Sequence, residues 1–108
     1  MRKGSVYRND RLAGELVETN DLQYVFTYDK EYLNDQEAKA ISLTLPKQKS
    51  AYRSEVLFPF FFNLLSEGVN KKLQSQQLKI DEKDSFGLLL ATAQYDTIGP
   101  VTVKRVLT

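Results

Sequence analysis

Alternating apolar and polar positions in the first third of the chain predict antiparallel strands. Two short runs, 5–8 and 12–18, are separated by a polar turn at 9–11 and followed by another polar turn at 20–21. Tyr24, Phe26 and Tyr28 then occupy every second position, which places three aromatic side chains on one face of a strand. We therefore expect a small meander whose aromatic face belongs to the core.

The middle of the chain is more polar and predicts less regular structure. Residues 29–39 are charged and allow one short helix. Ile41, Leu43 and Leu45 alternate with hydroxyl residues up to Pro46, which predicts a half-buried strand at 41–45. Residues 47–52 are basic and are interpreted as a connection.

The densest apolar segment is 57–65, which holds four phenylalanines and three leucines in nine positions. Ser54 is expected to cap a helix at 55–66, with Pro59 near its first turn and Gly68 at its C-terminus. Helical periodicity gives this segment an apolar arc of about 200°, wider than one contact with a sheet requires. Either the segment is the centre of the core, or part of its surface binds another protein.

Two further helices and a closing strand are predicted for the last third, at 69–78, 85–95 and 101–104. Val69 and Leu73 are expected to face inward, and Asp84 or Ser85 to cap the last helix. The chain therefore predicts one α+β domain spanning 1–108. Its antiparallel sheet comes from the N-terminal half plus the last strand, and about three helices pack on one face. The expected core residues are Tyr24, Phe26, Ile41, Leu43, Leu57, Phe61, Leu64, Phe86 and Leu89.

Composition removes most kinds of active site. The 108 residues include no cysteine and no histidine, which excludes thiolate chemistry, imidazole bases and sulfur-based zinc sites. Fifteen basic and fourteen acidic residues give a net charge of +1, so no strong field attracts nucleic acid or an anionic membrane. The sequence shows neither a long apolar run nor a signal peptide, and we expect a cytoplasmic protein without cofactor or metal.

Two weaker features allow a chemical interpretation. Asp81, Glu82 and Asp84 could bind a hard cation, but the regular oxygen spacing of a calcium loop is missing, which favours a solvated loop that caps a helix. Lys71 and nearby lysines, together with the aromatic strand at 24–28, could contact nucleic acid. The near-zero net charge favours instead a solvated helix face and a buried aromatic strand.

Five motifs follow one another in a specific order. They are Val-Tyr-Arg-Asn-Asp-Arg-Leu-Ala-Gly-Glu-Leu at 6–16, Tyr-Val-Phe-Thr-Tyr at 24–28, Ile-Ser-Leu-Thr-Leu-Pro at 41–46, Phe-Phe-Phe-Asn-Leu-Leu-Ser-Glu-Gly at 60–68, and a final pair, Asp-Ser-Phe-Gly-Leu-Leu at 84–89 with Asp-Thr-Ile-Gly-Pro-Val at 96–101. In this order they resemble the N-terminal subdomain of HipA-type serine/threonine kinases, the toxins of bacterial toxin–antitoxin systems. The resemblance covers nearly the whole chain.

Several positions depart from the family pattern. Ser66 stands where the family usually has proline, Gly87 replaces an acidic residue, Gln94 replaces glycine and Pro100 replaces alanine. The catalytic aspartate–asparagine pair and the metal-binding aspartate of a kinase have no counterpart in the sequence. Ending at Thr108, the chain resembles a free-standing HipS antitoxin of the three-gene HipBST systems, and it is expected not to be an enzyme.

That resemblance implies a partner rather than a substrate. It implies binding and inhibition of a HipT-type kinase toxin in trans, with a HipB-like DNA-binding protein as a possible third component and no direct contact with nucleic acid or membrane. Two other interpretations remain open at this point. One is an N-terminal fragment of a full HipA-type kinase, and the other is a small nucleic-acid-binding module.

The expected partner-binding surface is the end of the phenylalanine-rich helix and the turn after it. Leu57, Phe61 and Leu64 are expected to face the chain's own sheet, which leaves the flanking and polar positions free for a partner. The alternative is that Phe62 is ordinary core and that Ser66 is a neutral change. The residues of the expected surface are Phe62, Asn63, Ser66, Glu67 and Gly68, with Lys71 at the rim.

Overall fold

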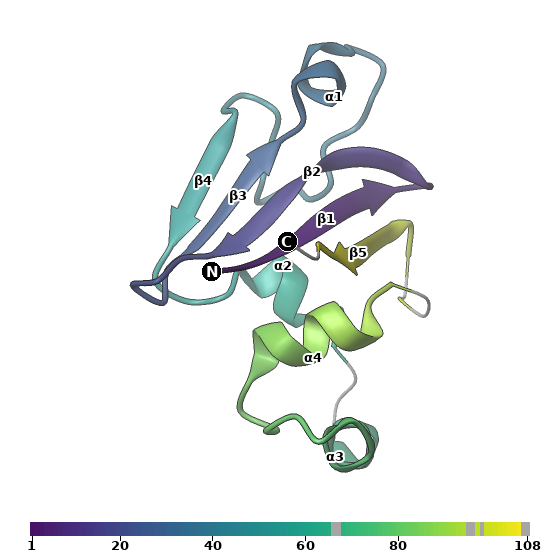
Figure 1. The fold of residues 1–108 in the computed structure, drawn as a ribbon. Coiled ribbons are helices and arrows are strands. Elements are labelled where there is room, and N and C mark those ends of the chain that lie inside the picture. Colours follow the sequence, from purple (N-terminus) through teal and green to yellow (C-terminus); the bar gives the residue numbers. More distant parts are fainter. Residues whose placement is uncertain (66–67, 95–96, 98, 107–108) are drawn as a thin grey trace.

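One antiparallel sheet forms the frame of the computed structural model (Figure 1). The structure describes residues 1–65, 68–94, 97 and 99–106. Within them, five strands are hydrogen-bonded in the order β4-β3-β2-β1-β5. This confirms the α+β class, the N-terminal meander and the closing strand. The strands are β1 (Arg2–Arg8), β2 (Arg11–Glu18), β3 (Tyr24–Tyr28), β4 (Ala51–Ser54) and β5 (Val101–Arg105).

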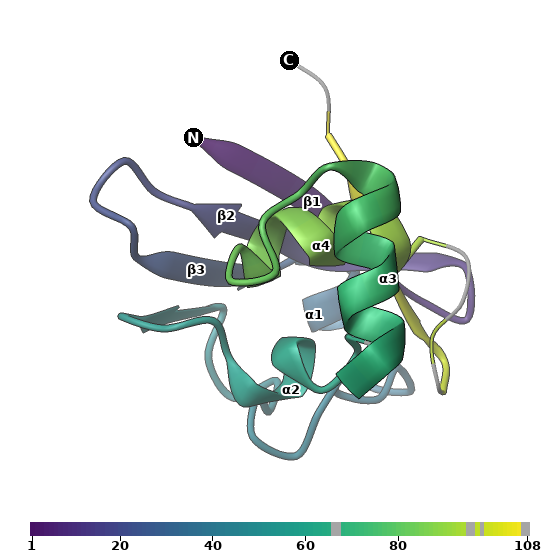
Figure 2. The same cartoon turned by 90° about the horizontal axis from the view of Figure 1, so that it is seen from below.

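Of the four helices in the described part of the chain, three lie on the same side of the sheet (Figures 1 and 2). Helix α4 (Ser85–Thr92) crosses the sheet with α2 (Pro59–Phe62) beside it, and α3 (Gly68–Leu78) packs against the outside of α4. The short α1 (Lys30–Asn34) follows β3 and contacts β2. Asp84 caps α4 by accepting a hydrogen bond from the Gly87 amide at 3.1 Å, so the predicted cap is confirmed.

The core fills the space between the sheet and this helix layer. Phe26 on β3 and Phe61 on α2 are both fully buried, and their ring centroids lie 5.7 Å apart. Gly4 on β1 lets α4 approach closely, because a Cβ atom there would lie 2.7 Å from a methyl carbon of Leu90. From the predicted core, Phe86, Leu89, Ile41 and Leu57 are also buried, whereas Tyr24 and Leu64 are only partly so.

The strand predicted at 41–45 is wrong. These residues form a tight turn closed by the amide of Leu45, which donates to the carbonyl of Ser42 at 3.1 Å. Ile41 and Leu45 point into the core, but Leu43 is 99% exposed and is not a core residue. The buried Tyr28 hydroxyl stabilises the turn, since it accepts from the Ile41 amide at 3.1 Å and donates to the Leu45 carbonyl.

Two more tyrosines bind the same loop through its main chain. Tyr32 stacks on Tyr28 with centroids 6.1 Å apart, and its hydroxyl donates to the carbonyl of Lys39. The Tyr52 hydroxyl donates to the carbonyl of Pro46. Three tyrosine hydroxyl groups therefore satisfy backbone carbonyls of a loop that has few backbone partners of its own.

The sheet's fourth strand comes from a segment that was predicted to be a connection. β4 begins at Ala51 and pairs with β3, with Tyr52 opposite Phe26. Ser54 ends this strand and does not cap a helix; its hydroxyl accepts from the amide of Val56 at 3.2 Å. Short alternating segments of this kind are recognised as strands only once their partner is known.

The long phenylalanine-rich helix predicted at 55–66 is also wrong, because among the described residues 55–65 only α2 (Pro59–Phe62) is helical. Pro59 at the first helical position disfavours the helical conformation for the residue before it, and Phe58 accordingly has ψ 134°. Leu57, Phe58 and Leu65 are buried from outside the helix, so the predicted wide apolar arc does not exist. Gly68 opens α3 instead of ending a helix that began at 55.

Smaller differences concern the last two helices. Leu73 on α3 is 49% exposed, so its predicted inward orientation is wrong. The side chain of Val69 lies outside the described residues. Helix α4 ends at Thr92, and the predicted end at Tyr95 lies outside the described residues.

We expect the two leucines of the 41–45 turn to differ sharply in their effect on stability. Leu45→Ala should lower the free energy of unfolding by about 2–4 kcal/mol, because Leu45 is 2% exposed and its removal leaves a cavity. Leu43→Ala should change it by less than about 0.5 kcal/mol. Urea denaturation of both variants checks this. Equal losses would show that 41–45 is the half-buried strand after all.

Candidate functional site

A groove lies where the β2–β3 turn, the segment after β4, α2 and the start of α4 meet. Its volume is about 300 Å³. Leu22, Val56, Leu57 and Phe62 supply the apolar part of its lining, and charged side chains such as Glu55 and Lys83 also border it. The lining of the groove therefore combines apolar side chains with charges of both signs, as protein-binding surfaces do.

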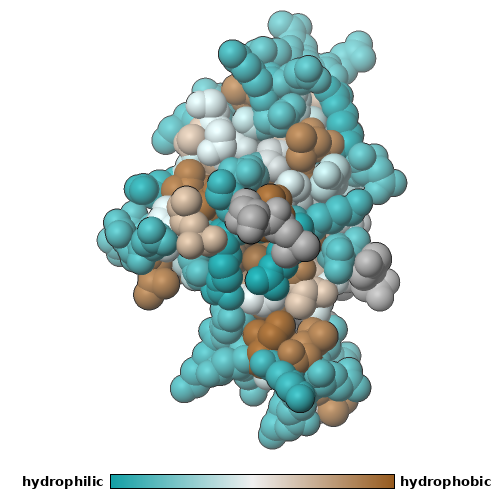
Figure 3. Space-filling view, in the orientation of Figure 1, coloured by the Kyte–Doolittle hydropathy of each residue, from teal (hydrophilic) through white to brown (hydrophobic). Residues whose placement is uncertain are grey.

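Exposed apolar side chains gather at this groove. Leu22 is 68% exposed, Val56 65% and Phe62 45%, and they are three of the eight large apolar side chains exposed among the described residues. In Figure 3, other apolar groups appear near α3 and α4, separated by hydrophilic residues. Apolar side chains that are exposed together at a concave site indicate a binding surface, whereas single ones need no explanation.

Part of the predicted partner surface lies at this groove. Phe62 ends α2, the exposed Asn63 follows it, and the Lys71 ammonium lies 5.1 Å from the centre of the Phe62 ring. This distance is typical of a cation–π contact, so α3 and α2 meet through these two side chains. With 45% of its surface exposed, Phe62 is not an ordinary core residue.

The other three residues of the predicted partner surface do not have described side chains. Ser66 and Glu67 lie outside the described residues, and Gly68 is the first residue of α3. The structure therefore brings Phe62, Asn63 and Lys71 together and does not place the other side chains of the predicted surface.

Leu22 and Val56 were missed by the sequence prediction. Leu22 has a backbone φ of 59°, in the left-handed region that an L-residue with a branched side chain rarely adopts. An exposed leucine held in such a conformation costs stability and is a reason to look for function. The available signal was an apolar residue directly after the polar turn predicted at 20–21. Val56 carries no such signal, because its exposure depends on where β4 ends.

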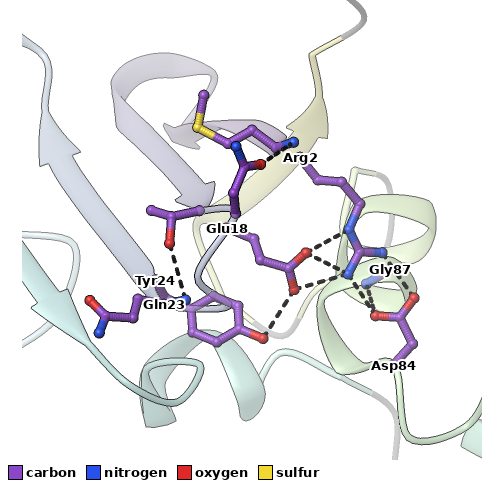
Figure 4. Close-up of polar contacts among 9 residues, drawn as sticks. Arg2, Glu18, Gln23, Tyr24, Asp84 and Gly87 are labelled. Carbon is purple, nitrogen blue, oxygen red and sulfur yellow. Dashed lines mark hydrogen bonds and ion pairs between the residues drawn. The ribbon is translucent and has the colours of Figure 1, made fainter.

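An arginine-centred network fixes the start of α4, next to the groove (Figure 4). Arg2 forms paired hydrogen bonds with Glu18, at 2.9 and 3.0 Å, and with Asp84, both at 2.9 Å. The Tyr24 hydroxyl donates to Glu18 at 3.1 Å. The guanidinium also lies over the Phe86 ring, 5.3 Å from its centre. Three strands are thereby joined to the N-terminus of α4.

The electrostatics of this network follow from the hydrogen bonds. The Arg2 guanidinium lowers the pKa of Asp84, and the carboxylates in turn raise the pKa of Arg2. Burial and the nearby Glu18 raise the pKa of Tyr24. Because Asp84 both binds Arg2 and caps α4, the helix-capping interpretation of the acidic segment is confirmed for this residue. Within the described residues, no three acidic side chains come together as a possible metal site.

The comparisons with known proteins agree with this architecture. A family model described as the HipA N-terminal domain matches residues 4–104. The chain belongs to the HipA N-terminal domain family. A solved structure entitled "N-terminal domain of HipA toxin" is 28% identical in sequence and superposes with a TM-score of 0.75. The match covers all of this chain and 95% of the chain in that structure. The relationship is therefore to the N-terminal subdomain of HipA and not to its catalytic kinase domain.

Two curated relatives differ greatly in length. An uncharacterized protein of Haemophilus influenzae is 29% identical over 105 residues, which are 97% of this chain and 93% of that protein. The putative kinase Y4mE of Sinorhizobium fredii is 26% identical over 85 residues, which are 79% of this chain but only 20% of the kinase. Among the described residues, no helix is long and apolar enough to span a membrane.

We expect Asp84 to stabilise the fold through its charge, in a pH-dependent way. Its pKa is lower in the folded state, so the stabilisation is complete above the unfolded pKa of about 4. It is lost as the pH falls through the lower folded value. Asp84→Asn should cost up to about 1 kcal/mol at pH 7, because the pair is partly exposed, and less at about pH 3, which lies below the unfolded pKa.

Urea denaturation at both pH values measures this difference. Asn is also a good helix cap, so the substitution tests the charge and leaves the cap in place. Asp81→Asn is the matched control, since Asp81 lies in the same acidic segment but forms no ion pair with Arg2. A loss at Asp84 that is independent of pH would contradict the ion-pair explanation.

Proposed function

We propose that this protein is a bacterial cytoplasmic antitoxin, like HipS, that binds a HipT-type serine/threonine kinase toxin in trans and inhibits it without catalysis. The observation that carries the proposal is the groove at Phe62, Leu22 and Val56 on a domain of the HipA N-terminal family. A subdomain that packs against a kinase body needs an apolar surface, and the same surface can bind a kinase supplied as a separate chain.

The two curated relatives support a separate existence of this domain. The match covers 93% of the Haemophilus influenzae protein and only 20% of Y4mE, so the domain occurs both with little else attached and within a much longer chain. A HipB-like DNA-binding protein is the natural third component, because it would bring DNA binding that this chain's near-neutral charge does not supply.

The binding energy is expected to come mainly from Phe62. Aromatic side chains in desolvated pockets supply much of the binding energy of most interfaces. The Lys71 ammonium already lies over one face of the Phe62 ring. Glu55 and Lys83 at the groove offer charges to a polar rim. Asn63 extends this surface, and we assign Ser66, Glu67 and Gly68 to it as further contacts.

Phe62→Ala is the direct test. The variant should weaken binding to a purified HipT-type kinase from the same operon by about 30-fold or more, corresponding to about 2 kcal/mol. Because Phe62 is half-exposed, the melting temperature should change by only a few degrees. Calorimetric titration measures the affinity, and kinase autophosphorylation measures the inhibition.

Leu43→Ala provides the matched control for this test. Leu43 is an exposed apolar residue that is not part of the groove, so its removal should leave the affinity unchanged. Unchanged binding by Phe62→Ala would place the inhibitory surface elsewhere. Equal losses in both variants would indicate nonspecific hydrophobic adhesion.

The pure protein should neither hydrolyse ATP nor phosphorylate itself, because the residue set for phosphoryl transfer is missing from its sequence. A radiolabelled ATP assay with the kinase partner as a positive control measures this. Reproducible turnover that persists through successive purification steps would contradict the proposal.

The alternative, a fragment of a full HipA-type kinase, makes a different prediction about the cell. An antibody against this domain would then detect a polypeptide several times longer than 108 residues. A free-standing antitoxin would appear as a small protein that co-purifies with a separate kinase.

A further inference from the structure

The two edges of the sheet differ in how their backbone groups are satisfied. At the β5 edge, the outward amide of Val103 donates to the carbonyl of Ala93, which follows α4, at 3.0 Å. The carbonyl of Val101 accepts from the Thr97 hydroxyl at 2.6 Å. Two outward groups of this edge are therefore satisfied by the chain itself, which is a common protection against pairing with another protein.

The β4 edge is open. The Tyr28 amide donates to the Ser50 carbonyl at 2.8 Å, and this bond sets the alternation along the β3–β4 ladder. Tyr52 and Ser54 consequently direct their amides and carbonyls toward β3, whereas Ala51 and Arg53 direct theirs away from the sheet. Within the described part of the chain, no hydrogen bond reaches the outward groups of Ala51 and Arg53.

Two of the usual protective devices are present at this edge, a strand of only four residues and a charged side chain, but others are missing. β4 contains neither proline nor a bulge, and its pairing with β3 is regular over its whole length. Its outermost position in the sheet is visible in Figure 1. Arg53 is exposed, and Lys49 nearby is exposed with its ammonium over the Tyr52 ring. The edge therefore offers free backbone groups beside positive charge.

The open edge continues directly into the groove. β4 ends at Ser54, and the next three residues, Glu55, Val56 and Leu57, line the groove together with Phe62. A chain that pairs with Ala51 and Arg53 and extends past Ser54 reaches this apolar lining within two or three residues, since a strand advances about 3.3 Å per residue. The edge strand thus leads directly into residues that line the groove.

We infer that an extended segment of the kinase partner pairs with β4 as an additional strand of the sheet and places an apolar side chain in the groove. This inference rests on the proposed function and specifies how the partner binds. The backbone of Ala51 and Arg53 supplies hydrogen bonds, and an acidic side chain on the partner strand pairs with Arg53. Specificity comes from the groove, because main-chain pairing alone does not select a sequence.

Amide hydrogen exchange followed by NMR tests the inference directly. In the free protein, the amides of Ala51 and Arg53 should exchange rapidly, and those of Tyr52 and Ser54 slowly. In the complex with the purified kinase, the two outward amides should slow by on the order of 100-fold. No other mode of binding at the groove alone produces this alternating pattern of new protection along β4.

A substitution pair supplies a second, independent readout. Arg53→Pro removes one outward amide and leaves the hydrogen bonds to β3 intact, because proline is tolerated on an edge strand when its nitrogen faces solvent. Arg53→Thr removes the charge but keeps the amide. Arg53→Pro should weaken kinase binding at least tenfold relative to Arg53→Thr. If Arg53→Pro does not fold, the exchange measurement on the unmodified protein decides.

The outcomes separate this inference from the proposed function. If the kinase binds while the Ala51 and Arg53 amides keep their free exchange rates, strand addition is overturned and the antitoxin proposal stands. If no complex with the kinase forms, both are overturned. If the same amides become protected in the protein alone as its concentration rises, the strand comes from a second copy of the chain, and the inference about the kinase is overturned.

Discussion

The contact between Phe61 and Phe26 determines the geometry of the functional surface. A four-residue helix has no stability of its own in water, so α2 exists only because Phe61 is buried against the sheet. The rings of Phe58 and Phe60 pack around Phe61, with centroids 6.2 and 5.2 Å away. Successive helical residues point about 100° apart, so packing both Phe60 and Phe61 on the core turns Phe62 outward. The exposed ring is thus a geometric consequence of the buried one.

Much of the sheet could be predicted from the sequence, because the first three strands are consecutive hairpins with polar turns between them. The same period-two reasoning was wrong at 41–45, where Ile41 and Leu45 are buried but the segment turns instead of extending. The alternation of apolar and polar residues indicates only which side chains face inward, and not whether the backbone is extended. It could not show that the hydroxyl of Tyr28, thirteen residues before Ile41, would satisfy the backbone of the turn.

Only the part of the candidate site that depends on local sequence could be predicted. Phe62 was assigned to the surface from its place beside Phe61 in a helical repeat, and this placement held although the helix proved much shorter than predicted. Leu22 and Val56 reach the same groove from a hairpin turn and from the end of an edge strand. Their meeting depends on the register of β4, which follows from tertiary pairing and not from local sequence.

The three tyrosines that bind the loop between α1 and β4 have a consequence for sequence variation. Their hydroxyls contact main-chain carbonyls, of Lys39, Leu45 and Pro46, and every amino acid has such a carbonyl. The loop is therefore fixed in place largely independently of the side chains it carries, apart from the buried Ile41 and Leu45 and from Lys47, whose ammonium donates to the carbonyls of Asp35 and Ala38. Related proteins are free to diversify its tip around Leu43 without redesigning the fold. For the same reason this tip is a suitable position for grafting a foreign peptide or a label.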